Sequence, residues 1–343
     1  MKLKTILVTG GAGYIGSHTV VQLLNAGFEV VIADDLSNSR LEVIDSIKQI
    51  TGKELTFIKA DLCNDDEVSA IFRENSIDAV IHFAAKKLVG ESVEKPLMYY
   101  KVNLISLMNV IDNCIKSDVR NFVFSSSCSV YGQPENLPVS EDAPLQTAES
   151  PYGNTKKIAE DILKDTSKVT PLNVISLRYF NPVGAHDSAL IGEYPLNAPS
   201  NLMPVITQVA AGKRDSLKVF GSDYNTIDGT CVRDYIHVVD LAEAHIAAMQ
   251  HLENNADARS FDVFNVGTGE GMSVLQIIKT FENVNGLKLN YELTERRSGD
   301  VEQVYGDTKK ANDILKWSAS HTLEEMISSA WNWEKKLTTK LNV

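Results

Sequence analysis

The 343-residue sequence lacks the features that mark membrane, secreted and metal-binding proteins. It has no long apolar run, whereas a helix that crosses a bilayer needs about 18 apolar residues or more. The start of the chain, Met1–Thr5, leads directly into a strand-like run and leaves no room for a signal peptide. Only four cysteines occur, without a C-x-x-C pair, and we expect them to be reduced thiols. These absences predict a cytoplasmic protein without a membrane partner or a bound metal.

An excess of positive charge is also absent. Lys and Arg number 33 against 45 Asp and Glu, which gives a net charge of −12. Such a surface repels nucleic acid, so no nucleic-acid partner is expected, and an anionic ligand needs a local basic pocket. Hydrophobic residues make up 43% of the chain, enough for a sizeable core. The length predicts one large domain or two unequal ones.

Short β-rich runs alternate with longer helical stretches from the start of the chain to about Tyr179. Apolar residues spaced three and four apart, such as Ile15, Val20 and Leu23, predict the helices. The predicted strands are Thr5–Thr9, Glu29–Ala33, Thr56–Lys59, Ala79–Phe83, Phe122–Ser126 and Val174–Leu177. This order predicts an α/β fold, a Rossmann-type doubly wound parallel sheet with helices on both faces.

The rhythm changes after Tyr179. Prolines among Gly and Asn predict a long, ordered loop over Pro182–Asn201, and a helix, a strand and a further helix are predicted after it. Their predicted bounds are Leu202–Ala211, Leu217–Phe220 and Val239–Leu252. We expect residues 1–180 to form a dinucleotide-binding domain that also receives part of 230–270. Residues 181–343 are expected to form a smaller mixed α/β substrate domain with returning segments.

A glycine-rich loop, Thr9–Gly16, follows the first predicted strand and opens a helix. Its glycines at positions 10, 13 and 16 permit a tight turn, a close backbone approach to a pyrophosphate and free amides at the helix N-terminus. The spacing is G-x-x-G-x-x-G rather than G-x-G-x-x-G, and glycine clusters also mark plain turns. Its place between the first strand and a helix favours a dinucleotide site.

Acidic residues follow the next two strands. Asp34 and Asp35 stand at the end of the second strand, the next strand after the glycine loop. An acid there accepts hydrogen bonds from an adenosine ribose 2′-hydroxyl and repels a 2′-phosphate, which favours NAD over NADP. A solvated acidic turn is the alternative. Asp61, which follows the third strand closely, is placed to meet the adenine edge.

Tyr152 and Lys156 lie one helical turn apart, on one face of a predicted helix. A nearby ammonium lowers the pKa of a phenol from about 10 toward neutrality, so that the phenolate can act as a general base toward a hydroxyl. Ser127 stands earlier in the chain and follows a strand whose end faces the cofactor crevice of a parallel sheet. The predicted catalytic residues are therefore Tyr152, Lys156 and Ser127.

These residues resemble extended short-chain dehydrogenases/reductases, and further motifs are similar to the UDP-glucose 4-epimerase family. The resemblance covers roughly residues 4–335, in the order and approximate spacing of the family. The further motifs are Ile81–Ala84, Gly90–Ser92, Val130–Gly132, Ser150–Gly153, Arg178–His186, Asn201–Pro204 and Arg233–His237.

The resemblance implies a reversible, NAD-dependent 4-epimerisation of UDP-hexoses in galactose metabolism. Tyr152 would take the proton of the sugar 4′-hydroxyl while NAD⁺ accepts hydride from C4, and Ser127 would bridge Tyr152 and the sugar oxygen. Lys156 would hold the nicotinamide ribose and lower the pKa of Tyr152. The 4-keto intermediate would rotate about its phosphate linkage before hydride returns to the opposite face. NAD is regenerated in each cycle and is expected to stay bound in a closed site.

The resemblance also implies which positions bind each ligand. The positions for NAD are Gly10, Gly13, Tyr14, Ile15, Gly16, Asp34, Asp35, Asn38, Ser39, Asp61, Leu62, Phe83, Ala84, Ala85, Lys87, Asn103, Ser125, Tyr152, Lys156 and Tyr179. The positions for the UDP-sugar are Lys87, Ser127, Tyr152, Tyr179, Asn181, Asn201, Leu202, Phe220, Arg233, Tyr235, Arg297, Asp300 and Val304. Arg233 and Arg297 are also expected without the resemblance, because a pyrophosphate that binds to an acidic protein needs local cations that can form two hydrogen bonds each.

The sequence departs from the family at two positions. Val102 stands where many relatives have the first of two asparagines, so a contact to the cofactor is expected to be missing. Val304 matches a position where some epimerases have a tyrosine beside the sugar C2 substituent, and the smaller side chain predicts room for an N-acetyl group. Alternatively, Val304 is an ordinary strand residue, or a one-residue shift places Tyr305 there.

Three other functions compete with the epimerase. A dehydratase needs an acid pair after the hydroxyl residue, but Ser127 is followed by Cys128 and Ser129. A uronate epimerase or decarboxylase stays open, whereas a non-catalytic scaffold is disfavoured by the presence of all three catalytic residues.

A homodimer is implied by the resemblance alone. Helices around Met98–Lys116 and Asn154–Asp165 would pair with a second subunit as a four-helix bundle. Their apolar faces could equally well be intramolecular core. These faces comprise Leu104, Leu107, Met108, Ile111, Ile158 and Ile162.

Overall fold

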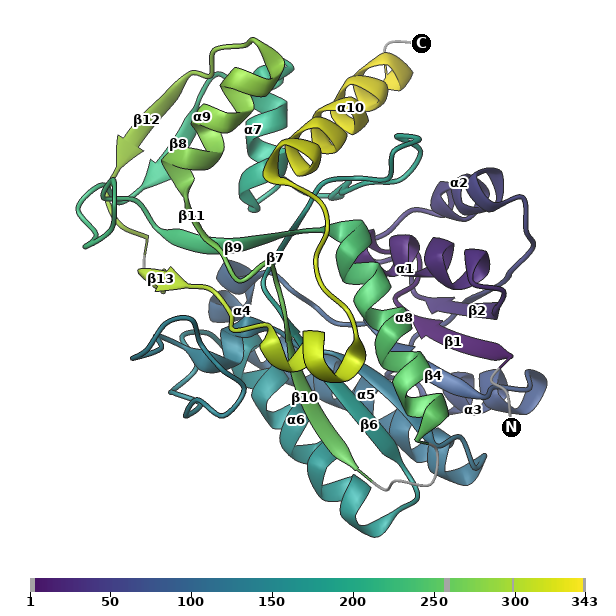
Figure 1. The fold of residues 1–343 in the computed structure, drawn as a ribbon. Coiled ribbons are helices and arrows are strands. Elements are labelled where there is room, and N and C mark those ends of the chain that lie inside the picture. Colours follow the sequence, from purple (N-terminus) through teal and green to yellow (C-terminus); the bar gives the residue numbers. More distant parts are fainter. Residues whose placement is uncertain (1–3, 256–259, 298, 342–343) are drawn as a thin grey trace.

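A seven-stranded parallel sheet forms the larger part of the molecule (Figure 1). The computed structural model describes residues 4–255, 260–297 and 299–341. The strand order is β10-β6-β5-β4-β1-β2-β3, so the chain reverses direction across the sheet between β1 and β4. The strands are β1 (Thr5–Thr9), β2 (Glu29–Asp34), β3 (Thr56–Lys59), β4 (Ala79–His82), β5 (Asn121–Ser125), β6 (Asn173–Tyr179) and β10 (Phe261–Val266).

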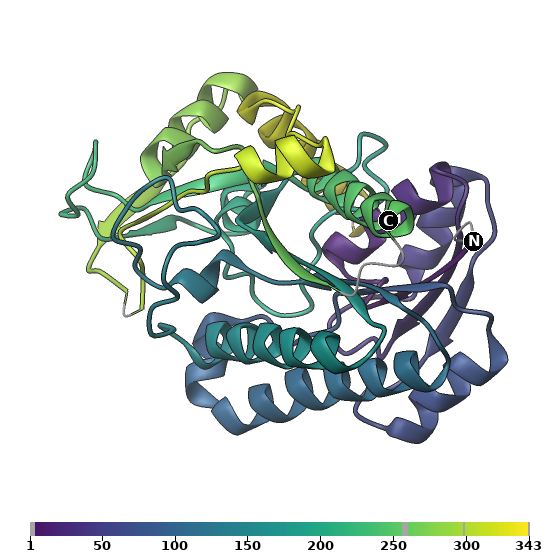
Figure 2. The same cartoon turned by 60° about the horizontal axis from the view of Figure 1, so that its bottom comes forward.

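Helices cover both faces of this sheet because its strands are apolar on both sides. On β1, Ile6 and Val8 pack into one core cluster and Leu7 into the other. The helices of the first layer are α1 (Tyr14–Asn25), α2 (Glu42–Thr51) and α8 (Val238–Asn254). Those of the second are α3 (Asp65–Glu74), α5 (Pro96–Lys116) and α6 (Pro151–Val169). Figure 2 shows α5 and α6 side by side across the lower face. The predicted Rossmann-type doubly wound sheet is confirmed.

The sheet is completed by residues from late in the chain. β10 pairs with β6 in parallel, from Phe261 opposite Val174 to Val266 opposite Tyr179. Helix α8, which precedes β10, packs against α1. The sequence patterns predict no strand at Phe261–Val266, but both elements lie within the 230–270 part that is expected to return.

The smaller part of the molecule is mixed α/β, as predicted. Strand β9 (Val232–His237) lies at its centre and pairs with β7 (Asn181–Val183), β11 (Gly271–Ser273) and β13 (Gln303–Val304). The loop predicted over Pro182–Asn201 thus begins as a strand. The other elements are α7 (Leu202–Ala210), β8 (Leu217–Phe220), α9 (Val274–Asn285), β12 (Tyr291–Thr294), a π-helical turn (Ala311–Leu315) and α10 (Leu323–Leu341). Two short helices, α4 (Val89–Glu94) and a 3-10 helix (Cys128–Tyr131), lie near the sheet.

Candidate active site

The glycine loop lies at the carboxyl end of β1, beside the reversal point of the sheet. Gly10 has φ +70°, and a Cβ on Gly16 would lie 2.3 Å from the Gly10 carbonyl oxygen, so both positions require glycine. Helix α1 begins at Tyr14 without a side-chain cap and without an acid in its first turn. Its first amides are therefore free to bind an anionic group, and the loop fits the pyrophosphate of a dinucleotide.

The acid at the end of β2 is tied to this loop. Asp34 is buried and accepts hydrogen bonds from the Ala12 amide (3.1 Å), the Leu36 amide (2.9 Å) and the Ser39 hydroxyl (2.7 Å). Burial raises the pKa of Asp34, and these hydrogen bonds oppose the rise. Asp35 is exposed and accepts from the Ser37 amide. The structure thus places Asp34 as a brace between β2 and the glycine loop, with Asp35 open to solvent.

Other predicted cofactor positions gather in the loops that follow β2, β3 and β4. They are Asn38, Ser39, Asp61, Leu62, Phe83, Ala84, Ala85 and Lys87. Asn103 on α5 is buried, and its side chain forms hydrogen bonds with other residues of the chain. It accepts from the Lys86 amide (2.7 Å) and donates to the Lys86 carbonyl oxygen (3.0 Å) and to Thr155 Oγ1 on α6 (3.1 Å). The Asn103 side chain therefore fastens the loop after β4 to the helices behind it.

The three predicted catalytic residues come together at the ends of β5 and α6. Ser150 caps α6 by accepting a hydrogen bond from the Gly153 amide, which fixes the first turn that carries Tyr152. The Ser127 side chain lies near the Tyr152 phenol and favours its ionised form. Lys156 is buried and donates to the Ser125 carbonyl oxygen (2.6 Å), while the Ser125 hydroxyl lies 2.7 Å from the Tyr179 hydroxyl.

The electrostatics of this trio differ from the prediction. Burial raises the pKa of Tyr152 above its ordinary value, and the nearby Ser127 side chain opposes only part of the rise. Burial also lowers the pKa of Lys156 to about 7, against the opposing charge of Glu160. The predicted lowering of the Tyr152 pKa is wrong for the protein without ligands, because desolvation of the phenolate outweighs its other interactions.

A buried ion pair between α6 and β6 supports the segment that carries the three predicted catalytic residues. The sequence analysis did not identify it. Arg178 on β6 donates to Glu160 on α6 at 2.5 Å, and both side chains are almost fully buried. Glu160 Oε1 also accepts from the hydroxyls of Ser126 (2.6 Å) and Ser176 (2.9 Å). Because Ser126 lies between Ser125 and Ser127, this network fixes the end of β5. In the sequence, Lys156 and Glu160 are four residues apart, and this spacing could have indicated that an acid lies beside the predicted lysine.

The predicted substrate positions lie mainly in the smaller part of the molecule. Arg297 pairs with Asp300 (2.7 Å), and its guanidinium lies 5.3 Å from the centre of the Phe220 ring. Burial raises the pKa of Cys128 to about 12, and the charge of Arg233 on β9 opposes this rise. The other positions are Asn181 on β7, Asn201 and Leu202 at the start of α7, Tyr235 on β9 and Val304 on β13.

Val304 connects the two parts. It is buried, pairs with Arg233 and packs in a cluster with Val130, Tyr131 and the partly buried Cys128. Cys128 follows Ser127 directly. The neighbouring Tyr305 instead directs its ring toward Gly271 on β11. The structure therefore places the side chain of Val304, rather than that of Tyr305, beside the segment that carries Ser127.

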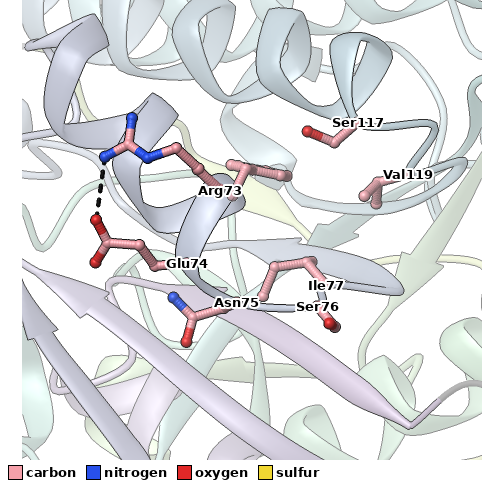
Figure 3. A pocket seen from close by; sticks show the side chains of 8 residues that line it. Arg73, Glu74, Asn75, Ser76, Ile77, Ser117 and Val119 are labelled. Carbon is pink, nitrogen blue, oxygen red and sulfur yellow. Dashed lines mark hydrogen bonds and ion pairs between the residues drawn. The ribbon is translucent and has the colours of Figure 1, made fainter.

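A shallow hollow lies elsewhere, at the opposite edge of the sheet (Figure 3). It is lined by Asn75, Ser76 and Ile77 before β4 and by Ser117 and Val119 before β5. Ligands of doubly wound sheets bind outside the carboxyl ends of the strands, so this hollow is not part of the candidate site. The described ranges contain no group of three or more His, Cys, Asp or Glu placed to hold a metal. They also contain no helix long and apolar enough to span a membrane.

Comparisons with known proteins agree over almost the whole chain. Residues 7–330 match the family model described as GDP-mannose 4,6 dehydratase. The UDP-glucose 4-epimerase of Haemophilus influenzae is 52% identical over 331 residues, which cover 96% of this chain and 97% of that protein.

Two solved structures extend this likeness to the fold. The UDP-glucose 4-epimerase of Bifidobacterium longum, in complex with NAD+ and UDP, matches with a TM-score of 0.94 and 44% identity over 97% of this chain and 98% of that one. The UDP-Glc/GlcNAc 4-epimerase of Campylobacter jejuni matches with a TM-score of 0.83 and 39% identity over 97% and 99%. The fold, the glycine loop and these likenesses agree, and the chain belongs to the UDP-glucose 4-epimerase family.

Proposed function

We propose that this protein interconverts UDP-glucose and UDP-galactose by NAD-dependent 4-epimerisation, as a step of galactose metabolism. The observation that carries the proposal is the meeting of Tyr152, Ser127 and Lys156 at the same sheet edge as the glycine loop. The sheet and its helices, residues 1–180 with α8 and β10, are assigned to NAD. The rest of residues 181–343 is assigned to the UDP-sugar.

NAD, when bound, supplies the hydride acceptor and donor for the sugar C4. In its phenolate form Tyr152 takes the proton of the 4′-hydroxyl, and Ser127, which lies near the phenol and favours that form, bridges it to the sugar oxygen. Lys156, which donates to the Ser125 carbonyl oxygen, would hold the nicotinamide ribose. Arg233 and Arg297 bind the diphosphate of UDP, which the net acidic surface otherwise repels.

A product assay tests this function. The purified protein is incubated with UDP-galactose without added nucleotide, and the products are separated by chromatography. UDP-glucose is the expected product, because a cofactor regenerated in each cycle stays with the protein. Conversion only after NAD⁺ is added would indicate that the protein retains the cofactor weakly. A Val102→Asn variant would then be the first to examine. No conversion with NAD⁺ present would reject the proposal and favour a uronate substrate.

Acceptance of N-acetylated sugars is a finer part of the proposal. Support comes from the placement of Val304 beside the Ser127 segment and from the substrate pair in the name of the Campylobacter jejuni relative. A Val304→Tyr variant is expected to lose UDP-GalNAc turnover by about 10-fold or more while keeping UDP-galactose turnover, because the added ring fills the space for the acetamido group. Chromatography of both reactions measures the ratio. Equal, low UDP-GalNAc turnover in both proteins would contradict it.

We also propose that the protein is a homodimer in which α5 and α6 pair with a second subunit as a four-helix bundle. Leu107 and Ile111 on α5 belong to the intramolecular core, whereas Leu97, Ile105 and Met108 on the same helix are exposed by 73%, 36% and 44%. Exposed apolar side chains gathered on one helix are typical of protein interfaces. A Leu97→Glu/Met108→Glu variant is therefore expected to be a monomer.

Light scattering measures the mass of the wild type and this variant. Ile227→Glu is the control, because Ile227 is 81% exposed in the smaller part of the molecule, and the dimer is expected to persist in it. A wild type of monomer mass would contradict the proposal.

A cytoplasmic location is proposed because the four cysteines are all free. Thiols stay reduced in the cytosol and are oxidised in secretory compartments. Fractionation of cells that express the protein tests this, and recovery outside the cytosolic fraction would contradict it.

A further inference from the structure

Glu193 contacts one residue of the loop after β4 and one residue at the start of α7, both of which belong to the predicted ligand-binding positions. It lies in the segment between β7 and α7, and no sequence motif pointed to it. Its Oε1 accepts a hydrogen bond from Asn201 Nδ2 at 2.6 Å and lies 3.4 Å from Lys87 Nζ. Lys87 belongs to the loop after β4, and Asn201 precedes α7. One carboxylate oxygen therefore holds one side chain from the loop after β4 and one from the start of α7.

The backbone of Glu193 is itself fixed. Trp333 on α10 donates its indole N–H to the Glu193 carbonyl oxygen (3.0 Å), and its side chain packs with Ala185 and Leu337. The Glu193 side chain is only 12% exposed. Its negative charge also contributes to a raised pKa of Tyr14, whose hydroxyl donates to the Gly184 carbonyl oxygen (2.7 Å), so the carboxylate lies in the neighbourhood of that hydroxyl. Packing thus sets the position of this carboxylate.

Asn201 has an unusual role for its position. An asparagine that precedes a helix ordinarily accepts a hydrogen bond from one of the first amides of that helix. Asn201 is the N-cap of α7 but makes no such bond, and the first turn of α7 contains no acid. Its side-chain amide is instead donated to Glu193. Pro204, the third residue of α7, has no N–H, so the amides of Leu202 and Met203 are the ones that stay available for an anionic group.

We propose that Glu193 is a positioning residue for the diphosphate of the UDP-sugar. It orders the long side chain of Lys87 and keeps Asn201 from capping its own helix, so that the ammonium and the α7 amides are ready for the ligand. This inference rests on the proposed function. Without Glu193, UDP would have to order a free lysine and displace an asparagine cap. These losses outweigh the relief of charge repulsion, because Lys87 already offsets the carboxylate charge.

The test compares Glu193→Ala and Glu193→Gln with the wild type. The alanine variant is expected to raise KM for UDP-galactose, and the calorimetric Kd of UDP alone, about 10-fold. Its kcat is expected to change less than about twofold, because Tyr152, Ser127 and Lys156 keep their contacts. Its Tm is expected to equal or exceed the wild-type value, since Asn201 can then cap α7. The glutamine variant keeps an oxygen acceptor and is expected to lie within about threefold of the wild type in KM.

Glu282→Ala is the matched control. The side chain of Glu282 is also 12% exposed and pairs with a lysine, Lys288, at 2.9 Å, but it lies on α9, outside the proposed site. KM and the UDP Kd are expected to be unchanged in this variant. The inference is overturned if Glu193→Ala leaves both values unchanged or lowers them, or if it lowers kcat alone. If the wild type fails to convert UDP-galactose, the proposed function fails, while UDP calorimetry still decides the role of Glu193.

Discussion

Replacement of Tyr152 by phenylalanine is expected to lower kcat for UDP-galactose about 1,000-fold. The change removes the phenolic oxygen that we propose takes the substrate proton, and it leaves the ring in place. Ser127 and Lys156 keep their backbone positions, because the Glu160–Arg178 pair and the α6 cap fix them independently of the phenol. KM is expected to change only a few-fold, since the Tyr152 phenol is not among the groups assigned to the diphosphate.

Steady-state kinetics on the NAD-saturated variant measures this effect. Tyr100→Phe is the matched control, because the Tyr100 hydroxyl also accepts a hydrogen bond, from Asn154 Nδ2 at 2.7 Å, but on the outer helices α5 and α6. Its kcat is expected to equal that of the wild type. A Tyr152→Phe variant within about 10-fold of the wild type would remove Tyr152 from the proton transfer.

A Lys156→Met variant is expected to be nearly inactive and yet more stable than the wild type below pH 7. Burial lowers the pKa of Lys156 from 10.5 to about 7, so the folded state loses a proton that the unfolded chain keeps. Between about pH 7 and 10.5 the unfolded chain binds more protons, so the stability of the wild type rises with pH over this window. Below it, the buried ammonium costs its full penalty, which methionine does not incur. The expected gain in Tm at pH 6 is roughly 5 °C.

Thermal unfolding at pH 6 and pH 9.5 measures the effect as a difference between variant and wild type. The gain is expected to be largest at pH 6 and to shrink at pH 9.5. Lys168→Met is the control, because Lys168 lies on the same helix but is 61% exposed beside Asp165. A gain that is equal at both values of pH would show that the folded protein does not depress the pKa of Lys156.

Local sequence patterns predicted those strands, helices and loops whose conformation is determined by residues close to them in the chain. The strands β1 to β6 are short apolar runs between periodic helices, and burial on both faces selects such runs. The glycine loop was predictable for the same reason, because its conformation depends on contacts within the loop and with the adjacent strand. The strand at Phe261–Val266 was not predicted, since its partner, β6, ends at Tyr179, far earlier in the chain.

Contacts between distant segments account for what the sequence did not indicate. Spacing by one helical turn placed Tyr152 and Lys156 on one face but carried no information on burial, which reversed the predicted pKa shift of Tyr152. Asn103 stays a predicted cofactor position, but the sequence did not indicate its hydrogen bonds to Lys86 and Thr155, 17 and 52 residues away. Glu193 stands in a segment whose apolar residues show no periodic spacing. Its partners, Lys87 and Asn201, belong to two other segments of the chain.

The late arrival of β10 and α8 affects how the protein is made. When the ribosome has added the chain as far as β6, that strand is an open sheet edge, and α1 lacks the helix that packs against it. Both gaps close only after Val266 has left the exit tunnel, by which time β9 and α7 have been synthesised as well. The nascent large sheet therefore carries an unpaired strand through much of translation, the period in which such edges recruit other chains. Fragments that stop shortly after Tyr179 inherit that exposed edge permanently.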